Sequence, residues 1–357
     1  MNFYADEQHV KITGRTLYRD HIRYLGYSAT SVSFRFTGKK ASACLISDPE
    51  NWPQESHAWI AVYINEAENP LKRIELTEKE QDILLYESNQ EETVTITIMK
   101  YSEPEYAVCG IESITIDSDN LLPPPPKKQR QIQIIGDSIS CGYGVEGSVE
   151  DMVHNTATEN PAKAYSVLTA QALDADLEIV AWNGKGVFSS YIGDDRDTPD
   201  QSWLVPMLYE YTDAGCCKQY FREPQEKWEK WDSSRLTPDL VIVYLGTNDA
   251  SYTREIPERN QEFSQAYQKL LQNIHTKHPQ AKILCTVGTM DPRLNTTVKQ
   301  AATEFAENHP EVDITAFALP HQLDKDGLGT FWHPTAITHK KAATLIIEQA
   351  KKLMDWD

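Results

Sequence analysis

Four short segments of the sequence carry side chains that together could hydrolyse an ester. The first is Gly-Asp-Ser at 136–138, which follows the apolar run 132–135, and its Ser138 is a candidate nucleophile. A serine at the end of a strand, leading towards a helix, lies where a parallel sheet presents catalytic groups. Backbone N–H groups also converge on an anion there. By itself Gly-Asp-Ser is weak evidence, because Asp and Ser are ordinary turn and cap residues.

His333 is the candidate general base that such a serine requires. It lies in Gly-Thr-Phe-Trp-His-Pro-Thr at 329–335, just before the last predicted helix. A histidine in a loop, away from an apolar helix face, is free to take a proton from a serine hydroxyl. None of the other nine histidines has a comparable setting.

Two further segments could hold the oxyanion that forms when a serine attacks a carbonyl group. Gly184 follows the predicted strand 177–181, and a glycine there lets a backbone N–H approach a reacting carbonyl closely. Asn248, in Gly-Thr-Asn-Asp at 246–249, carries a side-chain NH2 that could serve as a second donor. Taken alone, each segment is also an ordinary turn after a strand.

The elements around these segments alternate between strands and helices, which favours a mostly parallel sheet covered by helices on both sides. The carboxyl ends of parallel strands share one edge of a sheet, so the four segments are expected to meet there. The predicted strands are 132–135, 177–181, 240–245, 282–287 and 312–316, and the predicted helices are 164–173, 260–274, 298–305 and 336–353.

The part before residue 120 shows a different pattern, in which short segments alternate apolar and polar residues with a period of two. Such a pattern predicts strands with one buried face, and no long helix interrupts them. We therefore expect an antiparallel β-sandwich of the jelly-roll kind. The predicted strands are 32–36, 41–46, 59–64, 73–76, 94–99 and 111–116.

Four consecutive prolines at 123–126 separate the two parts. Proline donates no backbone hydrogen bond and favours an extended polyproline conformation, so this run predicts a short semi-rigid linker. The predicted domains are a β-sandwich at 1–122, a linker at 123–130 and an α/β domain at 131–357. At about 100 to 200 residues per domain, a length of 357 residues fits two domains.

Composition and charge exclude several classes of protein and partner. The chain has 34 Lys and Arg against 53 Asp and Glu, a net charge of −19, which disfavours binding to nucleic acid or anionic lipid. No apolar run approaches a membrane span, and the first residues lack the pattern of a signal peptide. We expect a cytoplasmic protein, or a secreted one if a leader was removed. The six cysteines show no metal-ligand spacing and are expected to be reduced, mostly buried thiols.

The four segments in this order resemble the SGNH (GDSL-type) hydrolase superfamily, whose name records its Ser, Gly, Asn and His residues. Longer motifs resemble carbohydrate esterase family 2, whose members carry a jelly roll ahead of the hydrolase domain. The similarity spans nearly the whole chain. These motifs are Gly-Asp-Ser-Ile-Ser-Cys-Gly-Tyr-Gly at 136–144, Trp-Asp at 231–232 leading to Thr-Pro-Asp-Leu at 237–240, Gly-Thr-Asn-Asp at 246–249, and Asp-Gly-Leu-Gly at 326–329 ahead of Trp-His-Pro at 332–334.

The resemblance implies a three-layer α/β hydrolase domain that removes acetyl groups from plant polysaccharide fragments such as xylan and glucomannan, without a metal or other cofactor. It implies that Ser138 attacks the acetyl carbonyl and that His333 takes its proton. It further implies that the backbone N–H groups of Ser138 and Gly184, with the side chain of Asn248, hold the oxyanion. Water then cleaves the acetyl-enzyme.

One position departs from the superfamily pattern. Many members have an Asp three residues before the catalytic His, and this sequence has Thr330 there. We predict a Ser138/His333 dyad in which a backbone carbonyl, that of Trp332 as the first candidate, orients the imidazole, with Asp326 as a lesser candidate. Asp137 and Asp249 are expected to organise their loops.

Aromatic side chains near the motifs could offer flat faces to sugar rings. Most tryptophans serve in core packing, so we expect only Trp332 and Tyr143 to bind substrate.

Two alternatives to a saccharide deacetylase stay open at this point. One is a less selective carboxylesterase or lipase-like hydrolase acting on short acyl esters. The other is a carbohydrate-binding protein with a lectin-like jelly roll and an inert hydrolase domain. The sequence does not choose the glycan or the acetyl position, the role of the N-terminal domain, or the oligomeric state.

Overall fold

The computed structural model describes residues 1–357, and the chain divides into two compact units. The N-terminal unit comprises Met1–Lys127 together with His154–Glu159 and Thr212–Glu229. The C-terminal unit comprises Lys128–Val153, Asn160–Tyr211 and Lys230–Asp357. Two short segments that follow the proline run in the sequence therefore pack with the N-terminal unit.

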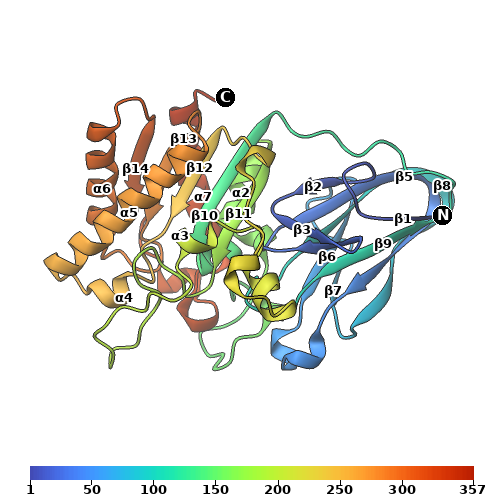
Figure 1. The fold of residues 1–357 in the computed structure, drawn as a ribbon, viewed down its shortest axis with the longest axis horizontal. Helices are drawn as coiled ribbons and strands as arrows, with labels where there is room; N and C mark the ends of the chain where they lie inside the picture. Colours follow the sequence, from blue (N-terminus) through green and yellow to red (C-terminus); the bar gives the residue numbers. More distant parts are fainter. The chain divides into compact units, whose positions relative to one another are not determined.

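Antiparallel strands make up the N-terminal unit (Figure 1). Their order in the sheet is β3-β4-β9-β5-β8-β6-β7, with β1 paired to β9 and β2 to β5. Every pairing is antiparallel. The strands are β1 Asn2–Phe3, β2 Lys11–Thr13, β3 Thr16–Arg19, β4 Ile22–Leu25, β5 Ser31–Ile46, β6 Trp59–Ile64, β7 Lys72–Glu75, β8 Glu80–Lys100 and β9 Gly110–Ile116.

Two long strands fold this sheet over its own core. β5 pairs with β8 from Ser31 to Ile46, and the register shifts on either side of Lys40 and Ala41. Extra residues of this kind bend a strand, so each long strand contributes to two layers. The apolar residues of the alternating pattern fill the space between the layers, among them Val32, Phe34, Ala43, Leu45, Ile96 and Ile98.

The C-terminal unit is built on five parallel strands in the order β11-β10-β12-β13-β14 (Figure 1). These are β10 Arg130–Asp137, β11 Ala175–Trp182, β12 Leu240–Tyr244, β13 Lys282–Val287 and β14 Ile314–Ala318. All residues of β12 are buried, as expected for a strand covered on both faces.

Helices cover both faces of this sheet. Helix α2 packs against α7, and α5 packs against α6. Right-handed crossovers place the helices after β10 and those after β12 and β13 on opposite faces, because the chain moves in opposite directions along the sheet. The helices are α1 Ser138–Cys141, α2 Tyr165–Ala172, α3 Val205–Leu208, α4 Ala250–Thr253, α5 Pro257–Lys277, α6 Asn295–Asn308 and α7 Ala336–Met354.

Short single-turn helices fill several of the connections between these elements. They are η1 Pro49–Asn51, η2 Gln54–Ser56, η3 Thr156–Thr158, η4 Pro161–Lys163, η5 Cys216–Tyr220, η6 Gln225–Lys227, η7 Ser233–Arg235, η8 Asp324–Asp326 and η9 Thr330–Trp332.

The predicted fold class, an antiparallel sandwich followed by an α/β domain with a parallel sheet, is confirmed. All six cysteines are buried, and none of them forms a disulfide bond. No helix combines the length and the apolar character that crossing a bilayer requires.

The order of the five strands singles out β10. The chain passes from β10 to β11 on one side and then to β12 on the other, so the strand order reverses at β10. Ligands of open α/β sheets bind at such a switch point, beyond the carboxyl ends of the strands. Residues that follow β10 are therefore well placed for a functional site.

Candidate active site

Ser138 lies directly after β10, at the first residue of helix α1. The preceding Asp137 caps this helix, because its carboxylate accepts a hydrogen bond from the N–H of Ile139 at 3.1 Å. Ser138 is only 4% exposed. The strand end and the cap together fix the serine at the switch point.

His333 contacts Ser138 across a separation of 195 residues. Its Nε2 lies 2.8 Å from the Ser138 Oγ, and its Nδ1 lies 2.9 Å from the carbonyl oxygen of Thr330. A carbonyl oxygen only accepts, so the Nδ1 that faces it carries the proton and Nε2 is the free acceptor. This tautomer is the one that can take a proton from the serine hydroxyl.

The carbonyl that orients His333 belongs to Thr330, so the expectation of Trp332 is wrong. The carbonyl of Trp332 instead accepts a hydrogen bond from the side chain of Gln322 at 2.7 Å. Asp326 does not orient the imidazole either, since its carboxylate pairs with Lys341 at 2.6 Å. A backbone carbonyl thus stands where a carboxylate would complete a triad.

The local backbone explains why this carbonyl reaches the imidazole. Phe331 (φ 49°, ψ 45°) and Trp332 (φ 62°) both adopt left-handed conformations, which cost non-glycine residues on the order of 1–3 kcal/mol each. The resulting turn brings the Thr330 carbonyl back over His333, whose N–H also donates to it at 3.1 Å. Sequence reasoning had no signal for this turn, because neither residue is of a type that favours positive φ.

Gly184 and Asn248 follow the strands on either side of β10. In the register of the sheet, Asp137 is opposite Trp182 and Ile135 is opposite Val243, so both segments emerge beside Ser138. Gly184 has a φ of +71°, and no atom lies within 4 Å of the position of its missing Cβ. The structure therefore brings the predicted Ser, Gly and Asn segments to one sheet edge, together with His333.

The side chain of Asn248 is held in place by the neighbouring segment. Its Nδ2 donates to the carbonyl oxygen of Lys185 at 2.9 Å, and the residue is 8% exposed. An amide nitrogen carries two hydrogens, so one remains for another acceptor. The bond to Lys185 also ties the loop after β11 to the loop after β12.

Asp249 organises this pair of loops, as predicted. Its buried carboxylate accepts hydrogen bonds from the N–H groups of Val187, Phe188 and Ser189, at distances from 2.8 to 3.1 Å. Burial raises the pKa of Asp249 to about 6, although these three N–H groups act to lower it. The carboxylate thus fixes the segment that follows Gly184.

Asp137 also has a perturbed titration. Burial raises the pKa of Asp137 to about 7, with a smaller contribution from the nearby charge of Asp249, against the hydrogen bond from Ile139. The residue is completely buried next to Ser138. The fold thus holds a carboxyl group there that is close to half-protonated at neutral pH.

The aromatic residues near Ser138 and His333 differ in exposure. Tyr143 is 5% exposed, and its ring centroid lies 4.4 Å from that of His333. Trp332 is 58% exposed, and so offers a free ring face. Sequence reasoning did not single out Tyr191, which is 64% exposed and whose N–H donates to the Gly184 carbonyl at 2.8 Å. Its only sequence signal is its position after the glycine turn.

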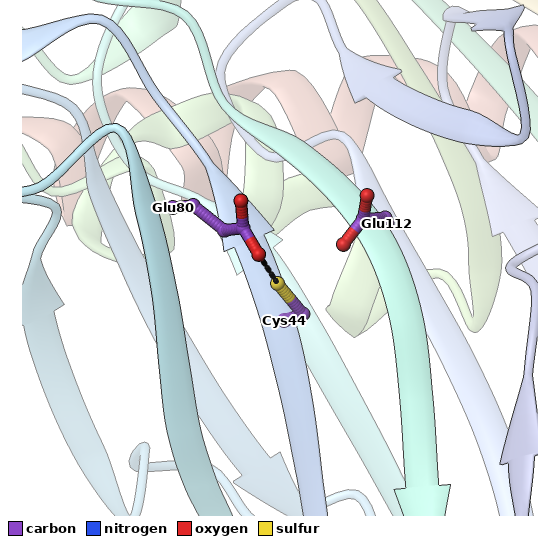
Figure 2. Close-up of side chains that lie close together, drawn as sticks. All are labelled: Cys44, Glu80 and Glu112. Carbon is purple, nitrogen blue, oxygen red and sulfur yellow. Dashed lines mark hydrogen bonds between the residues drawn. The ribbon is translucent and has the colours of Figure 1, made fainter.

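One group of side chains has the composition of a metal site, and it lies in the N-terminal unit. Figure 2 shows Cys44, Glu80 and Glu112, which come from β5, β8 and β9 and whose donor atoms lie within 4.8 Å of one another. Burial, followed by the effect of Glu112, raises the pKa of the Cys44 thiol to about 12. A thiol that stays protonated at neutral pH is a poor ligand. This group by itself assigns no metal.

Family comparisons agree with this fold. Residues 134–341 match the model of the GDSL-like Lipase/Acylhydrolase family, and residues 12–126 match the Carbohydrate esterase 2 N-terminal model. The chain belongs to the GDSL-like lipase/acylhydrolase family, and its N-terminal part is the domain found in carbohydrate esterases of family 2. It is therefore a carboxylic ester hydrolase, and the resemblance inferred from the motifs is confirmed.

Individual relatives are similar over nearly the whole chain. An acetylxylan esterase / glucomannan deacetylase of Cellvibrio japonicus is 29% identical, over 99% of this chain and 91% of its own length. The structure of a family two carbohydrate esterase from Cellvibrio japonicus has a TM-score of 0.83 at 26% identity, covering 100% of this chain and 98% of that one. A family two carbohydrate esterase from Clostridium thermocellum, solved in complex with cellohexaose, has the same fold, with a TM-score of 0.83 at 24% identity over 98% of this chain and 100% of that one.

Proposed function

We propose that this chain removes O-acetyl groups from acetylated saccharides of the xylan and glucomannan type. The observation that carries the proposal is the contact of 2.8 Å between the Ser138 Oγ and the His333 Nε2, with Nδ1 held by a carbonyl. The name of the Cellvibrio japonicus relative supports the acetyl group and the two glycans. The net charge of −19 further favours a neutral substrate over a polyanionic one.

The first half of the reaction transfers the acetyl group to the protein. The Ser138 Oγ forms a bond to the acetyl carbonyl carbon while its proton passes to the His333 Nε2. The tetrahedral intermediate then breaks its bond to the sugar oxygen, which leaves with the proton from Nε2. The product is the free sugar hydroxyl and an acetyl ester on Ser138.

The second half returns the protein to its starting state. A water molecule attacks the acetyl ester and gives a proton to Nε2 of His333. The bond between the carbonyl carbon and the Ser138 Oγ breaks, and the serine takes that proton back. The product leaves as acetic acid, which gives its remaining proton to water and becomes acetate, and no metal ion or cofactor takes part in either step.

The oxyanion in both halves is held by the N–H groups of Ser138 and Gly184 and by the second hydrogen of the Asn248 Nδ2. The bond from Asn248 to Lys185 supports this role, because it fixes the amide before the substrate arrives. Donors that are already oriented stabilise the developing charge without a cost for reorganisation. The three hydrogen bonds to Asp249 hold the Gly184 segment in the same way.

Trp332 and Tyr191 are the aromatic residues that we assign to the saccharide. Both residues are more than half exposed. Trp332 precedes His333 in the chain, and the backbone N–H of Tyr191 donates to the carbonyl oxygen of Gly184. The faces of aromatic rings suit the apolar faces of sugar rings. Tyr143 is buried against His333, so we assign it to packing against the imidazole and not to sugar binding.

Acetate release from acetylated xylo-oligosaccharides and manno-oligosaccharides tests this function directly. We expect release by the wild type and none by Ser138→Ala. A series of acetyl, propionyl, butyryl and longer aryl esters separates a deacetylase, whose rate collapses beyond propionyl, from a broad carboxylesterase. If the wild type binds these glycans and releases no acetate from any of them or from aryl acetates, the inert carbohydrate-binding alternative is correct.

A further inference from the structure

We propose that the segment 144–151 positions the base of the reaction, and that Asp151 is a positioning residue that acts through Thr330 on His333. This inference rests on the proposed function, because it assigns a role in a reaction of the Ser138/His333 dyad. The loop lies outside the catalytic motifs, except for its first residue, Gly144, which ends the motif at 136–144. The role is one of geometry, since Asp151 contacts neither the nucleophile nor the base.

Thr330 is enclosed by this segment on several sides. Its N–H donates to the carbonyl oxygen of Gly144 at 3.2 Å, and its Oγ1 donates to the Oδ2 of Asp151 at 3.2 Å. Thr330 is only 1% exposed. Its backbone and its side chain are therefore both held by the same loop.

The fit between the two segments leaves no room for adjustment. A Cβ added at Gly147 would lie 2.0 Å from the Thr330 Oγ1 and 2.7 Å from the Asp151 Oδ2. Distances below 3.0 Å are not tolerated by real side chains, so a glycine is required at this position for the contact to form. The glycine therefore lets the loop place the Asp151 carboxylate within hydrogen-bonding distance of the Thr330 hydroxyl.

Asp151 is itself anchored within the loop. Its Oδ2 accepts a hydrogen bond from the N–H of Ser148 at 2.7 Å, in addition to the bond from Thr330. The backbone of the loop is joined to the histidine segment a second time, because the N–H of Val149 donates to the carbonyl oxygen of Leu328 at 3.1 Å. The carboxylate is therefore a fixed point and not a mobile surface group.

The turn at 330–333, which carries His333, requires contacts that hold its conformation. Its orienting carbonyl follows from a turn with two left-handed residues, Phe331 and Trp332, and a strained turn relaxes unless its surroundings hold it. A neutral carbonyl also attracts an imidazole N–H less strongly than a carboxylate does. A triad acid orients the imidazole through its negative charge. Here the contacts from Asp151 to Thr330 and from Thr330 to His333 orient it by fixing the position of the carbonyl.

Substitutions at the two ends of the contact test the proposal. We expect Thr330→Val, which removes the hydroxyl and keeps the volume, to lower kcat about tenfold with KM changed by less than about twofold. Thr330→Ser keeps the hydroxyl and should stay near the wild type. Asp151→Ala should match Thr330→Val, and Asp151→Asn, which keeps an acceptor oxygen, should recover most of the loss.

Two further readouts distinguish positioning from a general loss of structure. The double variant Thr330→Val/Asp151→Ala should lose no more than either single variant, because both remove the same contact. The acidic limb of the kcat profile should move to lower pH in Thr330→Val, because a loosened carbonyl stabilises the imidazolium less. Thr169→Val is the control, since Thr169 is a buried threonine of helix α2 whose hydroxyl has no partner.

A measurement without turnover separates this inference from the proposed function. In protein labelled with 15N at histidine, the Nδ1–H proton of His333 should exchange with water about tenfold faster in Thr330→Val than in the wild type or in Thr330→Ser. Wild-type kcat and unchanged proton exchange in both Thr330→Val and Asp151→Ala would overturn the inference. If the wild type itself releases no acetate, the proposed function fails, and the exchange experiment still decides whether Asp151 and Thr330 position the imidazole.

Discussion

Replacing Asp137 by asparagine should change how the stability of the C-terminal unit depends on pH. Asparagine keeps the acceptor oxygen for the N–H of Ile139 and is an equally good helix cap. It differs from aspartate in that it stays neutral at every pH. The substitution therefore removes the titration of this buried group and leaves its hydrogen bond.

The pKa of Asp137 sets the size and the sign of the effect. The pKa is raised from 3.8 to about 7, mainly by burial, and a difference of about three pH units corresponds to about 4 kcal/mol. Between about pH 4 and pH 7 the folded state binds more protons at this group than the unfolded state does. The stability of the wild type therefore falls through this window as pH rises, because the charged form is penalised in the fold. Asp137→Asn escapes that penalty.

Urea unfolding at a series of pH values between about 4 and 8 measures the difference. We expect Asp137→Asn to match the wild type near pH 4 and to become more stable than it by up to about 4 kcal/mol near pH 8. Asp195→Asn, at an exposed turn position of the same unit, is the matched control and should follow the wild type throughout. A constant difference between Asp137→Asn and the wild type across this range would refute the assignment of a raised pKa to Asp137.

Three further predictions concern the oxyanion donors and the substrate. Asn248→Ala should lower kcat about 100-fold with little change in KM, as measured with an aryl acetate, because it removes one of the donors; an unchanged kcat would exclude this role. Asp249→Ala leaves three N–H groups without an acceptor, two of them buried and that of Phe188 partly buried, and should lower the free energy of unfolding by about 3 kcal/mol. A loss below about 1 kcal/mol in urea unfolding would contradict the anchoring role. Trp332→Ala and Tyr191→Ala should raise KM for acetylated oligosaccharides and leave KM for a small aryl acetate unchanged, and a rise for both substrates would argue against saccharide contacts.

Periodicity and motif order were sufficient to predict the fold and the meeting of four segments. The alternation of apolar and polar residues around Phe34 indicates a strand with one buried face. The continuous apolar run of β12 indicates a strand that is buried on both faces. Parallel strands share a carboxyl edge, so Ser138, Gly184 and Asn248 had to emerge near one another once the strands were recognised.

Contacts that depend on backbone turns could not be predicted in this way. The carbonyl of Thr330 reaches His333 through two left-handed residues whose types give no indication of it. The contact between Asp151 and Thr330 joins residues 179 positions apart, and no periodic pattern relates them. The packing of residues 154–159 and 212–229 with the N-terminal unit is equally long-range, and the proline run suggested a simpler division of the chain.

In the proposed reaction an acetyl group passes through Ser138, and trapping this acetyl-enzyme tests the reaction at its first covalent step. Wild-type protein is mixed with an acetylated substrate and quenched with acid during turnover, and the intact mass and the peptides are then measured. We expect one acetyl group, located on Ser138, in the wild type, and none in Ser138→Ala. Acetate release with the acetyl group on another residue, or undiminished release by Ser138→Ala, would contradict it.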